Sequence, residues 1–117
     1  MDLNRITIIG NVVRDPETKT AGKSGSLTAF TVATNRVWTD RETKTKKEAV
    51  DFHPVAAWGR LGEVAGQYLK KGSKVYVEGR LAHKTFESKT GGKQKTVEVV
   101  AENLILLTPK SAVDDQA

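Results

Sequence analysis

One stretch of helical periodicity among strand-like segments constrains the fold of this chain more than any other feature. Apolar residues recur at spacings of three and four between Leu61 and Leu69, which places them along one face of a helix. That stripe consists of Leu61, Val64, Ala65, Tyr68 and Leu69. Gly72 follows it, where a glycine can take the left-handed conformation past a last turn, and two lysines precede it at the negative end of the helix dipole. The sequence therefore predicts one helix that ends before Gly72, with Tyr68 in the core.

The segments on either side of this helix are typical of β-strands, because apolar residues alternate with polar ones in them. Ile6, Ile8 and Val12 fall on one face of the first segment, and Phe30, with no charged neighbour, is assigned to the core. The predicted strands are residues 3–14, 26–38, 49–58, 73–87 and 94–107. Residues 15–17 and Gly91-Gly92 predict turns, and the charged residues 39–48 predict a long exposed hairpin loop.

Three strands, one helix and two further strands, in this order, indicate a small closed barrel. Gly10 and Gly79 lie inside predicted strands, where such a barrel must bend. This arrangement resembles the oligonucleotide/oligosaccharide-binding (OB) barrel. We expect an all-β protein: a five-stranded OB-fold barrel over residues 1–108, with one helix between the third and fourth strands. Residues 109–117 are polar and are predicted to form a flexible tail.

Charge and composition narrow the class of function. The net charge of +5 favours a polyanionic partner, since phosphates gain from nearby Lys and Arg. The chain has no cysteine, which excludes disulfides, thiolate metal sites and cysteine nucleophiles. His53 and His83 lie in different predicted strands without metal-ligand spacing or a nucleophile motif, so we expect no enzyme, no cofactor and no metal site. No stretch reaches the roughly 20 apolar residues of a membrane span, and we expect a cytoplasmic protein without a membrane partner.

Four aromatic residues near loops or strand ends are interleaved with cations, and they are Trp38, Phe52, Trp58 and Phe86. The flanking cations are Arg36 and Arg41 around Trp38, Arg60 after Trp58, and Lys84 and Lys89 around Phe86. Flat rings on which bases stack and cations that follow phosphates are what sequence-neutral binding of a single strand requires. Residues 44–47, with Lys89, Lys93 and Lys95, would form two cationic arms around such a strand. The alternative for each ring is an ordinary core position.

Several short motifs follow one another along the chain at regular spacing. They are Leu3-Asn4-Arg5-Ile6 with Ile9-Gly10, Arg14-Asp15-Pro16-Glu17, Phe30-Thr31-Val32-Ala33-Thr34 with Trp38, Phe52-His53-Pro54-Val55, Trp58-Gly59-Arg60-Leu61, Tyr68-Leu69-Lys70-Lys71-Gly72-Ser73 and Val75-Tyr76-Val77-Glu78-Gly79. In this order the motifs resemble those of the bacterial single-stranded DNA-binding proteins, and the resemblance extends from Leu3 to Leu107.

The resemblance implies binding and protection of single-stranded DNA during replication, recombination and repair. It places Trp38, Phe52, Trp58 and Phe86 at the family's base-stacking positions. It places Arg5, Arg14, Arg60, Lys71 and Lys84 at or near phosphate-contacting positions, to which we add Arg36 because it flanks Trp38. His53 and Tyr76 are similar to residues between subunits, which implies a homotetramer. The alternative for His53 is a half-buried histidine whose hydrogen bonds are satisfied within its own chain.

Two departures from the family pattern qualify these expectations. Pro54 stands where the family often has a basic or polar residue, and proline supplies neither a cation nor an N–H. We therefore expect one phosphate contact fewer, and an edge or a bulge in the third predicted strand at Pro54. The family usually continues into a linker with an acidic tip that recruits replication and repair proteins. Recruitment through such a tip is not assumed here, and replication and repair proteins stay candidate partners. The alternative function is a protein-docking module on the same barrel, similar to primosomal accessory proteins.

Overall fold

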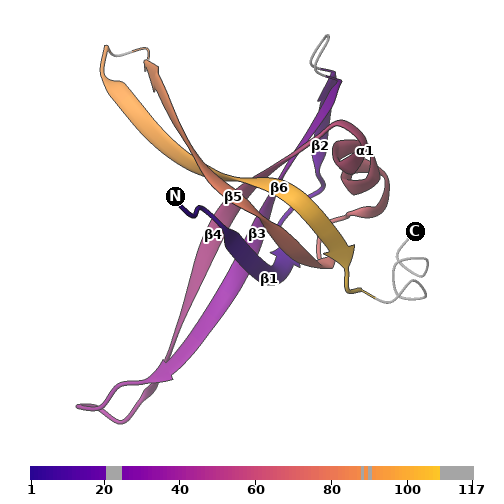
Figure 1. Cartoon of the computed structure of the whole chain (residues 1–117). Coiled ribbons are helices and arrows are strands. Elements are labelled where there is room, and N and C mark those ends of the chain that lie inside the picture. Colours follow the sequence, from indigo (N-terminus) through magenta and orange to yellow (C-terminus); the bar gives the residue numbers. More distant parts are fainter. Residues whose placement is uncertain (21–24, 88, 90, 109–117) are drawn as a thin grey trace.

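The computed structural model describes residues 1–20, 25–87, 89 and 91–108. Its elements are β1 (Ile6–Val12), β2 (Glu17–Thr20), β3 (Ser26–Thr39), β4 (Lys46–Trp58), α1 (Gly59–Tyr68), β5 (Lys74–Glu87) and β6 (Lys93–Leu106) (Figure 1). The expectations for the tail at 109–117 and for the side chain of Phe86 lie outside the described residues. No helix in the described ranges is long and apolar enough to cross a membrane.

Five of the strands close into a barrel. The strands neighbour one another in the order β1-β5-β6-β4-β3-β2, and β1 also pairs with β3 at Asn11↔Ala33 and Val12↔Val32. The join between β4 and β6 is parallel and comprises two residue pairs, Val55↔Val99 and Ala56↔Val100. The helix α1 follows β4 in the chain and precedes β5. The predicted five-stranded OB-fold barrel with one helix is confirmed.

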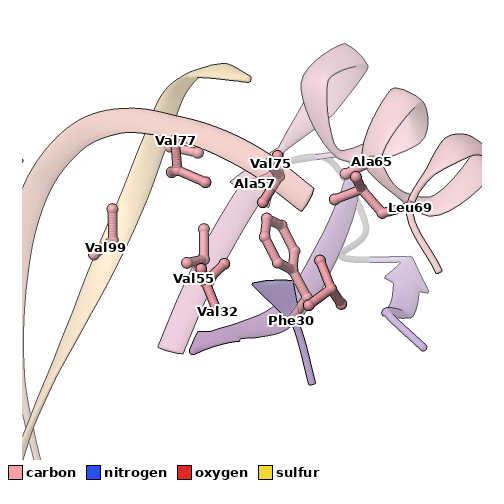
Figure 2. Close-up of a cluster of buried hydrophobic side chains, with 11 residues drawn as sticks. Phe30, Val32, Val55, Ala57, Ala65, Leu69, Val75, Val77 and Val99 are labelled. Carbon is pink, nitrogen blue, oxygen red and sulfur yellow. The ribbon is translucent and has the colours of Figure 1, made fainter. Parts of the chain in front are cut away.

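Alternating side chains of these strands fill the barrel. Figure 2 shows Phe30 and Val32 of β3, Val55 of β4 and Val99 of β6 pointing into one shared cluster. Phe30 is buried, as predicted. Ile6 and Ile8 are partly buried against the same cluster, while Thr7 between them and Ile9 after them are exposed. The period of two in the sequence therefore identified the inner face of these strands correctly.

The strand β2 was not predicted. All four residues of β2 are exposed, and they pair with residues 26–29 of β3. Thr18 Oγ1 lies 3.0 Å from Thr28 Oγ1 across this pairing. A strand with no buried face carries no apolar period, so its formation depends on backbone hydrogen bonds to a neighbour that is distant in sequence.

The predicted loop at 39–48 is a hairpin, but the loop itself is shorter than expected. Lys46, Lys47 and Glu48 belong to β4 and pair with the end of β3, which leaves residues 40–45 as the connection. Asp40 organises this loop, since its Oδ1 accepts the N–H of Glu42 at 2.9 Å. The Lys47 ammonium first, and then the backbone N–H groups of Glu42 and Thr43, hold the pKa of the Asp40 carboxyl below its ordinary value.

The predicted helix is present and ends before Gly72. It begins at Gly59 and ends at Tyr68, where Leu69 is already extended and donates its N–H to the Ala65 carbonyl at 2.9 Å. Gly72 does have a positive φ of 92°, but it lies in the turn that leads to β5 and does not cap the helix. Tyr68 is 52% exposed, so its assignment to the core was wrong. The contact between the helix and the barrel is narrower than the apolar stripe, so Val64 and Tyr68 remain exposed.

Candidate functional site

Two long hairpins extend beyond the barrel as arms (Figure 1). The first arm consists of the end of β3 and the start of β4, which remain paired out to Thr39↔Lys46. The second consists of the end of β5 and the start of β6, which remain paired out to Glu87↔Lys93. All residues of 44–47 on the first arm, and Lys89, Lys93 and Lys95 on the second, are exposed. The two predicted basic segments are therefore exposed at the ends of the two arms.

Phe52 and Trp58 lie on the outer face of the β3–β4 ribbon. Cross-strand partners share a face, and Phe52 pairs with Ala33 while Trp58 pairs with Leu27. The alternate pairs Phe30↔Val55 and Val32↔His53 point into the barrel. Phe52 is 61% exposed and Trp58 is 40% exposed, which argues against a core role for either ring.

Trp38 lies on the opposite face of the same ribbon. It is an even number of residues from Phe30 and Val32 in β3, which point into the barrel, and alternate residues of a strand share a face. Its side chain is 43% exposed. The Arg36 guanidinium carbon stands 5.3 Å from the centre of the Trp38 ring, a cation–π distance, and Arg36 Nε is 3.4 Å from Asp51 Oδ2. Lys47, the cross-strand partner of Trp38, reaches Asp40 Oδ2 at 3.0 Å. The three described rings are thus divided between both faces of the β3–β4 ribbon.

Phe86 is carried by the other arm. Its backbone lies in β5 opposite Gln94 of β6. Nearby in β5, Lys84 places its Nζ 2.7 Å from Glu98 Oε1 on the paired strand. The stacking position predicted at Phe86 therefore belongs to a different hairpin from the other three.

The predicted phosphate contacts divide into two groups. Three of these cations form ion pairs with carboxylates: Arg5 with Glu78, Arg36 with Asp51, and Lys84 with Glu98. Arg14, Arg60 and Lys71 are exposed, and within the described part of the chain no ion pair is found for them. The backbone N–H of Lys71 binds Asp15 Oδ1 at 2.9 Å, which brings Lys71 close to the turn that holds Arg14.

A shallow depression, here called the outer hollow, lies on the outer face between Trp58 and Phe52. It is lined by Arg14, Asp15, Glu17, Ala29, Phe30, Thr31, Pro54, Val55 and Glu98. A second hollow lies past Pro54 and Glu98 and includes Phe52, Val97 and Val99 in its lining. At Pro54, β4 pairs with Thr31 of β3, but its contact with β6 begins only at Val55. The predicted strand edge at Pro54 is therefore confirmed.

His53 and Tyr76 do not come together within one subunit. His53 is half-buried on the inner face of the ribbon, and its Nε2 lies 2.8 Å from Thr34 Oγ1. Tyr76 lies on the outer face of β5 and donates its hydroxyl to Glu78 Oε2 at 2.6 Å. Tyr76 is flanked by Ile9 of β1 and Ile105 of β6, both about half exposed. If both residues serve subunit contacts, they serve different ones.

Sequence reasoning missed several exposed side chains at or near these surfaces. Val37 and Val50 lie exposed on the outer face of the first arm, and Glu98 joins the lining of both hollows. Tyr68 is exposed beside Lys71, so the rule that singled out rings with cationic neighbours would have found it had it been applied to the helix. Glu98 gave no such signal, because its role depends on the spatial proximity of β6 to Pro54.

Comparisons with known proteins agree with this architecture. The model of the single-strand binding protein family matches residues 3–107. The fold is similar to that of a Plasmodium falciparum SSB in complex with single-stranded DNA, with a TM-score of 0.85 and 28% identity over 92% of this chain and 97% of that one. It is also similar to a deletion mutant of the single-stranded DNA binding protein from Thermus aquaticus, with a TM-score of 0.78 and 28% identity over 93% of this chain. The match covers 52% of the Thermus aquaticus chain, so this chain spans about half its length. With the family match extending over nearly the whole barrel, the chain belongs to the single-strand binding protein family.

Proposed function

We propose that this protein binds single-stranded DNA largely without regard to sequence and protects it during replication, recombination and repair. The observation that carries the proposal is the exposure of Trp38, Phe52 and Trp58, between 40% and 61%, with the Arg36 guanidinium over the Trp38 ring. In this proposal the protein acts in the cytoplasm on nucleoid DNA, without catalysis and without a cofactor. The similar Plasmodium falciparum SSB, whose structure is a complex with single-stranded DNA, supports it.

The mechanism follows from the chemistry of the exposed groups. Bases stack on the rings of Phe52 and Trp58 along the outer face, and on Trp38 across the ribbon, with Phe86 serving the second arm. Phosphates are contacted by two groups of cations. Arg14, Arg60 and Lys71 are available directly, whereas Arg5, Arg36 and Lys84 exchange a carboxylate for a phosphate. Because each phosphate contact releases bound counterions, affinity falls as salt rises.

The exposure of the rings favours this function over the protein-docking module. A docking module on the same barrel does not require large aromatic faces distributed over both sides of an arm. Exposed rings interleaved with arginine and lysine match the requirements of a single strand more closely, since every base offers a flat face and every nucleotide a phosphate.

A titration of intrinsic tryptophan fluorescence tests the proposal, since Trp38 and Trp58 are the two tryptophans of the chain. We expect strong quenching by oligo(dT), little quenching by duplex DNA of equal length, and an affinity for oligo(dT) that falls at least about tenfold between 50 and 200 mM salt. The physical reason is stacking on both indoles combined with counterion release. Fluorescence that does not respond to oligo(dT) at low salt would favour the docking module.

We further propose a homotetramer. An exposed apolar row crosses the outer face of three strands, from Ile9 of β1 through Tyr76 of β5 to Ile105 of β6. In addition, β1 pairs with β3 only at Asn11 and Val12, so most of β1 presents a sheet edge. Tyr76 contributes to the contact through this row, and His53 contributes to a separate contact from the inner face. Subunit association would cover this apolar row and remove it from water.

Placing a charge in this row tests the oligomer. We expect the wild-type protein to sediment as a tetramer at micromolar concentration and Ile105→Glu to sediment as smaller species, because a buried carboxylate without a partner costs several kcal/mol. Val64→Glu is the matched control, since Val64 is exposed on α1, away from the row, and should leave sedimentation unchanged. A monomeric wild-type protein, or a tetrameric Ile105→Glu variant, would contradict this assembly.

A further inference from the structure

The outer hollow lies on the proposed DNA path between Trp58 and Phe52, where a base is too far from either ring to stack on it. Trp58 and Phe52 are six residues apart on one strand, a separation of about 20 Å at roughly 3.3 Å per residue. Successive nucleotides of a stacked strand are about 3.4 Å apart, so more than one nucleotide must lie between the two rings. The side chains that line the hollow are therefore the ones that contact the nucleotides between the two rings.

The floor of the hollow suits a flat, uncharged group. Pro54 and Ala29 present apolar surface from adjacent strands, and Thr31 lies half-buried opposite Pro54. Pro54 has no N–H to donate to a phosphate. The floor can thus support one face of a ring, as an aromatic platform does, but offers no charge-assisted hydrogen bond to an anion.

The charges around the hollow also disfavour a phosphate within it. Asp15, Glu17 and Glu98 contribute three carboxylates to the lining, whereas Arg14 contributes one cation. A phosphate seated inside would meet more negative than positive charge, while Arg14 at the rim can hold a phosphate just outside. A nucleotide here would therefore point its base into the hollow and its backbone toward Arg14.

Glu98 supplies the hydrogen-bond acceptor in this environment. Its side chain is 21% exposed and lines the hollow beside Pro54, and without DNA its Oε1 lies 2.7 Å from Lys84 Nζ. An ionised carboxylate accepts several hydrogen bonds, so one ion pair does not exhaust its capacity. Carboxylates pair with the exocyclic amino group of cytosine, which thymine and uracil lack.

We propose that the outer hollow is a base subsite that prefers an amino-bearing pyrimidine, cytosine, through a hydrogen bond to Glu98. The proposal rests on the function proposed above and refines it, because the preference concerns one nucleotide within otherwise sequence-neutral binding. Pro54 supports the ring, Glu98 accepts from the N4 amino group, and Arg14 contacts the adjacent phosphate.

The test compares oligo(dC) with oligo(dU) of equal length, since the two bases have nearly the same size. They differ at C4, where cytosine has an amino group and uracil a carbonyl oxygen, and at N3, which carries a hydrogen only in uracil. We expect the unaltered protein to bind oligo(dC) at least about fivefold more tightly than oligo(dU) in equilibrium anisotropy titrations. Glu98→Met, which keeps the side-chain length and removes both acceptors, should bring the ratio of the two dissociation constants close to one. Loss of a negative charge in this variant raises the affinity for both oligonucleotides alike and cancels in the ratio.

Glu102→Met is the matched control, because Glu102 is exposed on the same strand and does not line the hollow. It should leave the ratio as in the unaltered protein. A ratio near one for the unaltered protein, or a preference that survives Glu98→Met, overturns the subsite while leaving the proposed function intact. Failure to bind either oligonucleotide would overturn both. The measurement on the unaltered protein decides the question even if Glu98→Met fails to fold.

Discussion

Replacement of both Phe52 and Trp58 by alanine is expected to weaken binding of oligo(dT) at least about 30-fold, which corresponds to about 2 kcal/mol. Each ring that stacks a base contributes roughly 1–3 kcal/mol, and these two lie on the same outer face of β4. Both side chains are substantially exposed, so their removal should leave the barrel stable. The measurement is fluorescence anisotropy of a labelled oligo(dT), because the double variant loses one of the two intrinsic tryptophans.

Val50→Ala is the matched control for this pair. Val50 is an exposed apolar residue on the same face of the same strand, two residues from Phe52, but it offers no ring. We expect its affinity for oligo(dT) to stay within about twofold of the wild-type value. A double variant that binds as tightly as Val50→Ala, with an unchanged melting temperature, would show that stacking on the outer face does not carry the interaction.

Substitution of Gly79 by alanine is expected to destabilise the fold by about 3 kcal/mol or more, a large part of the roughly 5–15 kcal/mol that holds a domain of this kind together. A Cβ at Gly79 would approach the carbonyl oxygen and carbon of Val100 within the 3.0 Å that real Cβ atoms do not cross. Both atoms belong to the backbone of β6, at the irregularity where the register between β5 and β6 shifts. The clash can be relieved only by separating the two strands. Urea unfolding followed by circular dichroism measures the change.

Gly91→Ala separates the clash from the conformational preference of glycine. Gly91 has a φ of 90°, and a Cβ there would meet nothing within 4 Å. Its replacement therefore costs only the backbone strain of a left-handed residue, about 1–2 kcal/mol. Equal destabilisation by the two substitutions would argue against close strand approach as the reason for glycine at position 79.

Periodicity in the sequence was sufficient to predict the barrel, because each barrel strand has one buried face. The inward positions of β1 and β5 alternate with exposed ones, and the apolar stripe of the helix has its own distinct spacing. Periodicity did not predict β2 or the first residues of β4. These segments are exposed on both faces, and their formation depends on pairing with β3. Periodicity also could not predict the exposure of Tyr68, because the width of the contact between α1 and the barrel depends on how the two pack together.

The candidate site could be predicted in part for a similar reason. Charged neighbours correctly singled out Trp38 and Trp58 as exposed, since a chain cannot bury a ring while keeping adjacent arginines in water at low cost. The division of the rings between two faces depends on strand register, which the sequence leaves open. The ion pairs of Arg5, Arg36 and Lys84 join separate segments of the chain, and the outer hollow is formed by four segments that are separate in sequence.

The placement of Trp38 opposite Phe52 on the first arm has a geometric consequence for bound DNA. A strand that stacks on both residues must pass around the edge of the ribbon, with its bases turned inward against protein on each side. Bases before and after this crossing then face opposite directions and cannot present one continuous Watson–Crick edge. Under the proposed function, a complementary strand or a hairpin stem would have to displace the arm before pairing across this point. The protein would then delay reannealing through the shape it imposes on the strand, in addition to the strength with which it binds.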